Sequence, residues 1–135
     1  MAETDLPFER LDFLYMPSRD VAADMTHLSE VLSGRVVFAI DAMGTRVAAI
    51  ELTEGAPLLL LTDHLEGDRP ILVYRVPDLR SALARLESRG WERERTFEIP
   101  YGPCCSFRTP GGHRFALYQL TRPEAAAHFD GRRDF

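Results

Sequence analysis

The fold of this chain is decided by residues 71–86, which read ILVYRVPDLRSALARL. The first part is an apolar run that predicts a β-strand ending at Pro77, because proline lacks the amide needed to continue a strand ladder. Asp78 is a suitable helix N-cap, since its carboxylate can accept hydrogen bonds from free amides of the first turn. A helix is therefore expected over residues 78–89, closed by Gly90. Its apolar residues recur at helical spacing, and they are Leu79, Ala82, Leu83 and Leu86.

Three strands are expected after this helix. They cover residues 91–99, 104–109 and 113–120, which contain β-branched and aromatic side chains. Residues 100–103 and 110–112 are rich in proline and glycine, so they predict the two turns between these strands. The second half of the chain thus has the order β-α-β-β-β.

The first half repeats this order. Residues 11–16 predict a strand, and residues 20–33 predict a helix with Asp20 as its N-cap and Gly34 as its stop. The apolar face of this helix is expected to consist of Val21, Met25, Leu28 and Leu32. Three further strands with short connections are expected at residues 35–41, 45–52 and 56–61.

The chain is therefore predicted to be a single α+β domain over residues 1–135, made of two βαβββ modules. The first module covers about residues 10–66 and the second about residues 70–121. One helix and four short strands are too few to close a core, so the two modules must pack together. A short charged tail follows from residue 122, with one or two helical turns expected at residues 125–129.

Composition excludes several classes of protein. The formal net charge of −5 argues against a general nucleic-acid-binding protein. No apolar run approaches the ~20 residues of a membrane span, and residues 1–10 carry three acidic side chains in place of a signal-peptide core. A cytoplasmic location is therefore expected. The two cysteines, Cys104 and Cys105, are adjacent, which fits neither a disulfide framework nor a zinc site.

Several stretches resemble modules of the vicinal oxygen chelate superfamily, which includes the glyoxalases and bleomycin resistance proteins. Residues 71–86 resemble the opening strand and helix of such a module, and residues 20–34 resemble the helix of its first copy. Residues 107–118, FRTPGGHRFALY, are similar to the family's closing hairpin, F-x-D-P-x-G-N-x-x-E-L-x. Pro100-Tyr101-Gly102 resembles the turn before that hairpin. The resemblance covers about residues 10–121 and implies two curved half-sheets around a cavity.

The resemblance also implies where a divalent metal would be held by histidine and glutamate, and those residue types are absent from these positions. The second module's histidine position falls on Ile71 and its glutamate position on Ala116. In the first module the histidine position falls on Phe13, or on Asp12 or Leu14 if the alignment slips by one, and the glutamate position falls among the four leucines 58–61. Carbon side chains cannot coordinate a divalent ion. Neither a metal nor another cofactor is expected.

The same positions predict a ligand site, because side chains two residues apart on a strand share a face. Ile71 then brings Val73 and Arg75 to the cavity, and Ala116 brings Arg114 and Tyr118. Phe13, Tyr101 and Trp91 are expected near the rim. The predicted ligand-binding residues are Phe13, Ile71, Val73, Arg75, Tyr101, Arg114, Ala116 and Tyr118.

Three functions remain open at this point. The first is a small-molecule-binding protein without a metal, such as one that sequesters an antibiotic or an aromatic metabolite. The second is a lyase, isomerase or dioxygenase of the same superfamily that uses displaced metal ligands or a carboxylate base, for which Glu51 and Glu98 are candidates. The third is a dimeric interaction module. A homodimer is expected in each case, because the half-open sheets leave apolar edges, and no nucleic-acid or membrane partner is expected.

Overall fold

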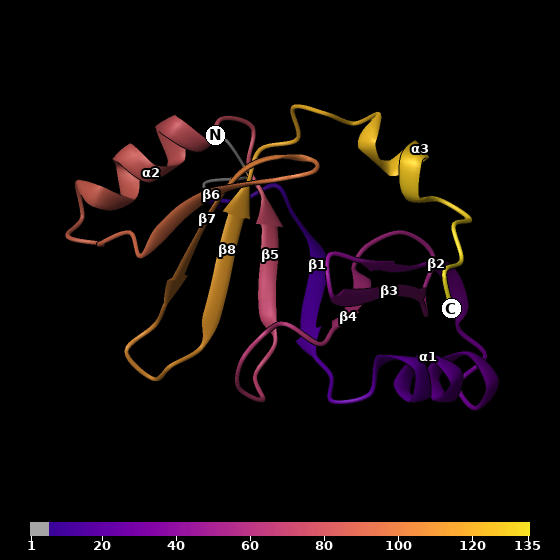
Figure 1. Ribbon diagram of the computed structural model, residues 1–135. Helices are drawn as coiled ribbons and strands as arrows, with labels where there is room; N and C mark the ends of the chain where they lie inside the picture. The colour runs from indigo at the N-terminus through magenta and orange to yellow at the C-terminus, as the bar shows by residue number, and fades with distance from the viewer. Residues whose placement is uncertain (1–5) are drawn as a thin grey trace.

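A computed structural model describes residues 6–135 of the chain (Figure 1). Residues 1–5 lie outside the described part, and so does that half of the segment 1–10 for which no signal peptide was expected. The elements of the first module are β1 (Arg10–Pro17), α1 (Val21–Glu30), β2 (Arg35–Ala42), β3 (Thr45–Glu51) and β4 (Leu58–Thr62). Those of the second are β5 (Ile71–Arg75), α2 (Leu79–Glu87), β6 (Arg95–Ile99), β7 (Gly102–Arg108) and β8 (Arg114–Tyr118). The short helix α3 (Ala125–Phe129) follows.

All eight strands form one open, curved sheet in the order β2-β3-β4-β1-β5-β8-β7-β6. Each module places its first strand parallel to its last, β1 beside β4 and β5 beside β8. The two modules join where β1 and β5 pair in antiparallel fashion, with Tyr15 opposite Ile71. The predicted doubled βαβββ order is therefore present, and the α+β fold class is confirmed.

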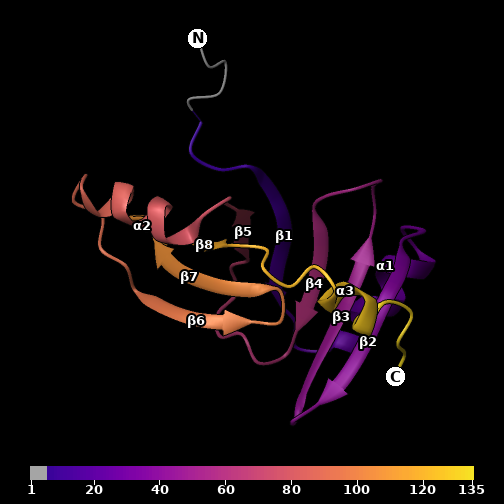
Figure 2. The same cartoon turned by 90° about the horizontal axis from the view of Figure 1, so that it is seen from above.

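The two long helices cover the outer side of the curved sheet, one on each half (Figure 2). Asp20 caps α1 by accepting a hydrogen bond from the Ala23 amide at 3.0 Å, and Asp78 caps α2 in the same way from Ser81. Under α1 lies a core that includes Val21, Met25 and Ile50, packed with Leu28 and others. The apolar face predicted for α2 is present, because Leu79, Ala82 and Leu83 are buried and Leu86 is partly buried.

Three local predictions were wrong. Leu32 is 53% exposed, because α1 already ends at Glu30. Leu32 therefore lies beyond the helix, in the turn that Ser33 completes in a left-handed conformation, and does not continue the apolar face. The strand predicted from residue 91 begins only at Arg95. Trp91 packs in the core under α2, with its ring 5.1 Å from that of Phe107, and so does not lie at the cavity rim.

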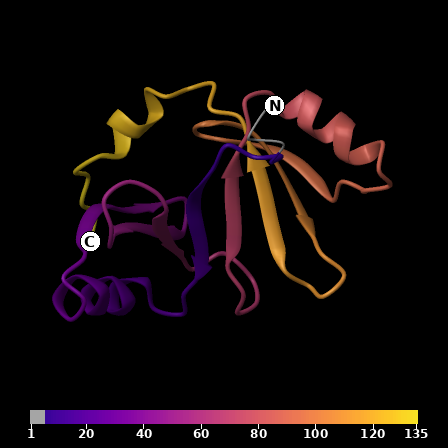
Figure 3. The ribbon, with the colours of Figure 1, turned by 180° about the vertical axis from the view of Figure 1, so that it is seen from behind.

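The C-terminal segment does not simply trail from the second module. Residues 122–135 run back to the first module, where α3 packs near β2 and the last residues lie along its outer edge (Figure 3). We call these residues the C-terminal strap. It connects the two modules a second time, in addition to the pairing of β1 with β5. Within residues 6–135, no helix combines the length and apolar character needed to cross a membrane.

Candidate functional site

The concave side of the sheet carries a cluster of aromatic and aliphatic side chains. At its centre the Phe13 ring stacks on that of Tyr101, with centroids 5.4 Å apart, and lies 5.7 Å from the Tyr118 ring. Val73, Cys104 and Ala116 are buried in the same cluster. Strand alternation creates this face, because Val73 of β5 and Ala116 of β8 are directly paired.

Six of the eight residues predicted to bind a ligand belong to this concave cluster, and they are Phe13, Ile71, Val73, Tyr101, Ala116 and Tyr118. The two arginines lie at opposite ends of it, since Arg75 is paired with Tyr118 and Arg114 with Ile71. Arg114 points at the linker, where its Nη1 donates to the Arg69 carbonyl oxygen at 3.5 Å. Ala116 is only 3% exposed, so the volume expected above it is filled by neighbouring side chains.

Three positions that the resemblance assigned to metal ligands, Phe13, Ile71 and Ala116, lie in the concave cluster. Phe13 pairs with Leu58 across β1 and β4, and Val73 with Ala116 across β5 and β8. The side chains at these positions are therefore of carbon only. Within residues 6–135, no group of three or more His, Cys, Asp and Glu side chains is arranged to hold a metal ion.

A buried carboxylate beside this cluster was not predicted to be functional. Asp12 is 5% exposed and accepts a hydrogen bond from the Tyr118 hydroxyl. Its other oxygen accepts from Arg10 Nε at 2.6 Å, and Arg75 Nε lies 3.6 Å from the first. That Arg75 nitrogen is buried and has no hydrogen-bond partner among the described residues.

A β-bulge explains how Asp12 reaches the concave side. Leu11 is paired with Tyr74, which faces the core under α2, whereas Phe13 is paired with Val73 on the concave side. The register therefore shifts at Asp12, and the extra residue allows both Asp12 and Phe13 to contact concave-side groups. Regular strand alternation places Asp12 and Phe13 on opposite faces, so it does not predict that both reach the concave side. An acidic residue inside an otherwise apolar strand was the one available signal.

The protonation states of this face follow from burial. Burial is the main cause that raises the pKa of Tyr118, and its hydrogen bond to Asp12 raises it further. Burial also raises the pKa of Tyr101 and brings that of the Cys104 thiol to about 12. Tyr118, Tyr101 and Cys104 are therefore protonated near neutral pH, so these phenols act as hydrogen-bond donors and Cys104 is not a nucleophile.

A cavity of about 210 Å³ opens beside the aromatic cluster, between the first module and the strap. Its walls come from β2, β4, the turn before β7 and α3, and the residues are Val37, Phe38, Leu58, Tyr101, Ala126, Ala127 and Asp130. Tyr101 is the member of the predicted ligand set that lines it. The Tyr101 ring also contacts Tyr118, at 6.4 Å between centroids, so it separates the cavity from the rest of the concave cluster.

Gly102 fixes the position of Tyr101. Its φ is +153°, and a Cβ there would clash with the backbone oxygen of Gln119 and lie 2.8 Å from Thr121 Oγ1. The Tyr101 carbonyl oxygen in turn accepts hydrogen bonds from the amides of Thr121 and Arg122. The Pro-aromatic-Gly turn noted in the sequence thus brings β7 against the end of β8 and holds the aromatic ring at the cavity wall.

The other candidate groups do not line the cavity. Glu51 forms an ion pair with Arg35, and Glu98, which is 63% exposed, pairs with Arg122. Cys104 and Cys105 face opposite sides of the sheet, as expected from strand alternation, and both are buried and unbridged. Neither glutamate is in place to act as a base on a ligand bound in the cavity.

Comparison with known proteins rests on structure alone. No family model matches the sequence, and no curated protein matches it. Methylmalonyl-CoA epimerase from Mycobacterium tuberculosis superposes with a TM-score of 0.74 at 19% identity, covering 92% of this chain and 95% of that one. The superposition therefore extends over both modules of this chain. The chain therefore shares its fold with this epimerase, including the two βαβββ modules expected from the sequence.

Two further solved structures with this fold contain ligands according to their names. A single-residue variant of Streptomyces coelicolor methylmalonyl-CoA epimerase in complex with 2-nitronate-propionyl-CoA has a TM-score of 0.67 at 16% identity, covering 84% of this chain and 96% of that one. A methylmalonyl-CoA epimerase in complex with methylmalonyl-CoA and NH4+ has the same score and coverage at 15% identity. At such identities the comparison establishes the fold and leaves the chemistry to be argued from the site.

The Asp12 cluster gives a direct test of the site's construction. Replacing Asp12 by Ala leaves the Tyr118 hydroxyl without its acceptor and removes one of the two carboxylates near the half-buried Arg75, the other being Glu9. We expect a loss of about 3 kcal/mol in the free energy of unfolding, measured by urea denaturation, because removing one partner leaves the others uncompensated. The matched control is Asp41→Ala, which breaks the Arg46–Asp41 pair, 44% exposed on both sides, and should cost less than about 1 kcal/mol. Equal losses in the two variants would contradict the proposed buried role.

Proposed function

We propose that this chain binds a small apolar or aromatic molecule on the concave side of its sheet without using a metal. The observation that carries this proposal is the cavity under α3, whose walls are aliphatic and aromatic apart from Asp130 and the hydroxyl of Tyr101. An apolar space with few polar groups is the usual construction of a small-molecule site. Side chains of carbon at the metal positions favour binding by packing over binding by coordination.

The eight predicted residues have four different roles in the proposal. Tyr101 contacts the guest in the cavity with the strap in place. Behind it lie the other members of the concave cluster, which form a second wall that a rotation of the Tyr101 ring would open to the guest; these are Phe13, Ile71, Val73, Ala116 and Tyr118. Arg75 is close to Tyr118, and its buried Nε, which forms ion pairs with Asp12 and Glu9 but no hydrogen bond among the described residues, can donate to an acceptor on the guest. Arg114 lies at the far end of β8 and would be reached only by a longer molecule.

Size restricts the guest. A cavity of about 150 Å³ in another protein holds benzene, so about 210 Å³ suits one aromatic ring with small substituents. Drug-sized ligands occupy sites of about 300–1,000 Å³. Sequestration of an antibiotic or a larger aromatic metabolite, the role we favour, therefore requires the cavity to widen. The named ligands of the structural neighbours, both CoA esters, support a small-molecule ligand in general and not this chemical class.

Filling the cavity tests this site. Ala127 is exposed on α3 and lines the cavity, so Ala127→Trp should occupy the space without disturbing the sheet. In a thermal-shift screen of aromatic compounds, any compound that stabilises the wild type should bind the variant at least ~10-fold more weakly, which is about 1.4 kcal/mol. Glu124→Trp, on an exposed position of the same segment outside the cavity lining, is the control and should bind normally. Unchanged affinity in folded Ala127→Trp would place the site elsewhere; Ala116→Trp then tests the deeper wall.

An enzyme of the same superfamily is the second candidate. The structural neighbours favour it, because those compared above are methylmalonyl-CoA epimerases, although their identity to this chain is below 20%. Within the chain, Asp12 is the carboxylate nearest the concave cluster and would be the base that removes a proton from the carbon next to a thioester carbonyl. Its hydrogen bonds from Tyr118 and Arg10 occupy both oxygens, which is why we rank catalysis second.

Proton exchange separates the two candidates. We expect no protein-dependent exchange at C2 of methylmalonyl-CoA in D₂O, followed by proton NMR, with or without added divalent metal. Exchange that is catalysed by the wild type and lost in Asp12→Asn would overturn the binding proposal in favour of the epimerase-type enzyme. Exchange that persists in Asp12→Asn would indicate a base other than Asp12.

A homodimer remains part of the proposal. Val31, Leu32 and Leu52 are exposed apolar side chains near the end of α1, and covering them would favour association. Light scattering at micromolar concentration should give twice the 15.3 kDa chain mass. A monomeric mass would contradict this expectation without affecting the cavity.

A further inference from the structure

The C-terminal strap is anchored firmly at its start. Arg122 Nη2 donates to the Ile99 carbonyl oxygen at 2.7 Å and to Glu98 Oε1 at 2.9 Å, while Nε donates to the Pro100 carbonyl oxygen at 2.9 Å. These groups lie at the end of β6 and in the turn before β7, beside Tyr101. The strap therefore leaves the second module from a fixed point next to the cavity.

The far end of the strap attaches as a short extra strand. The Gly131 amide donates to the Val37 carbonyl oxygen and the Ala39 amide to that of Arg132, each at 2.8 Å. Ala39 and Arg133 form a parallel bridge. These bonds use the free edge of β2, an edge that would otherwise present unpaired backbone groups to solvent.

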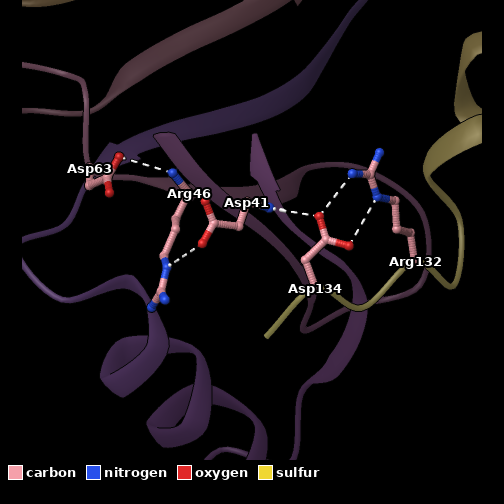
Figure 4. Close-up of polar contacts among 5 residues, drawn as sticks. All are labelled: Asp41, Arg46, Asp63, Arg132 and Asp134. Carbon is pink, nitrogen blue, oxygen red and sulfur yellow. Dashed lines mark hydrogen bonds and ion pairs between the residues drawn. The ribbon is translucent and has the colours of Figure 1, made fainter. Parts of the chain in front are cut away.

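Surface polar contacts hold this end in place (Figure 4). Asp134 accepts from the Asp41 amide and from Arg132 Nη2, both at 2.9 Å. The hydrogen bond from Arg132 is the main cause that lowers the pKa of Asp134. Asp41 in turn accepts from Arg46 Nε at 3.2 Å, and the Arg46 amide donates to Asp63. Each of these contacts is exposed, so each is weak and can be exchanged for water.

Between its two ends the strap is held by little apolar packing. In α3 only Ala125 is fully buried, and Phe129 rests against Phe38 and Tyr101 with ring centroids 5.5 and 6.4 Å away. Phe135 packs at the edge of the core under α1, with the Arg46 guanidinium 4.7 Å from its ring centre. Few buried contacts and exposed backbone hydrogen bonds are characteristic of segments that open locally.

The same segment forms one wall of the cavity, through Ala126, Ala127 and Asp130. We infer that the C-terminal strap is a gate for large guests: it swings from the Arg122 anchor, releases the edge of β2, and widens the open cavity beyond the volume of about 210 Å³ that it has with the strap in place. This inference rests on the proposed function for its purpose. It also removes the conflict between a cavity of about 210 Å³ and a drug-sized guest.

A reversible lock tests the gate. Adjacent strands lie about 4.8 Å apart, within the about 4.4–6.8 Å that separates the Cα atoms of a disulfide, so the bridged pair allows the double variant Ala39→Cys/Arg133→Cys. The probe is anilinonaphthalene sulfonate, a three-ring dye too large for the cavity with the strap in place. In stopped-flow fluorescence the oxidised variant should take up the dye at least ~10-fold more slowly than the same variant after reduction. Equal rates in the oxidised and reduced forms would overturn the gate.

Hydrogen exchange tests opening without any ligand. Amides of residues 129–135 and of β2 should exchange at least ~10-fold faster than those of β5, because the strap opens without global unfolding. Asp134→Ala should accelerate exchange in the strap further, while Glu124→Ala, which removes an exposed carboxylate at the start of α3, should not. Strap amides that exchange as slowly as β5 in all variants would overturn the inference.

The gate and the proposed site can fail separately. If dye uptake is slower in the oxidised than in the reduced double variant, but Ala127→Trp leaves every ligand affinity unchanged, the gate stands and the proposed site fails.

Discussion

The antiparallel pairing of β1 with β5 is the contact on which the rest of the molecule depends. It places the first strands of the two modules side by side at the centre of the sheet, with Leu14 opposite Leu72. Each module then extends outward through a parallel pairing to its own last strand. Because a helix covers the outer side of each half, the inner sides face one another across the curve. The concave surface therefore belongs to both modules, and neither could form it alone.

What occupies this surface follows from residue types at a few register positions. A phenylalanine, an isoleucine and an alanine stand at the positions where the resemblance of the sequence implied coordinating groups. The space is filled by packed rings, principally Phe13, Tyr101 and Tyr118. Binding energy on such a surface comes from the burial of apolar area and from ring contacts. The polar groups are concentrated at one end, around Asp12, where they are already paired with one another.

Local pattern was a good guide to the elements and a poor guide to long-range contacts. The N-caps Asp20 and Asp78 and the apolar face of α2 could be predicted, because capping and helical periodicity depend on a few neighbouring residues. Strand alternation correctly separated Cys104 from Cys105 and grouped Ala116 with Tyr118. It failed at Asp12, since a bulge is a property of the paired strands and leaves no periodic signal. The return of residues 131–134 to β2 also could not be predicted, because it depends on which sheet edge is free.

The burial of the two cysteines on opposite sides of the sheet has a practical consequence. Both thiols are shielded, and the Cys104 thiol, with its pKa near 12, is almost wholly protonated under ordinary conditions. Alkylating reagents react with the thiolate, so the native protein should not react with them until it unfolds. The rate of thiol modification therefore reports the rate of global unfolding. A single cysteine introduced at the surface would also be the only site labelled, which allows a fluorophore or spin label to be placed without removing the natural residues.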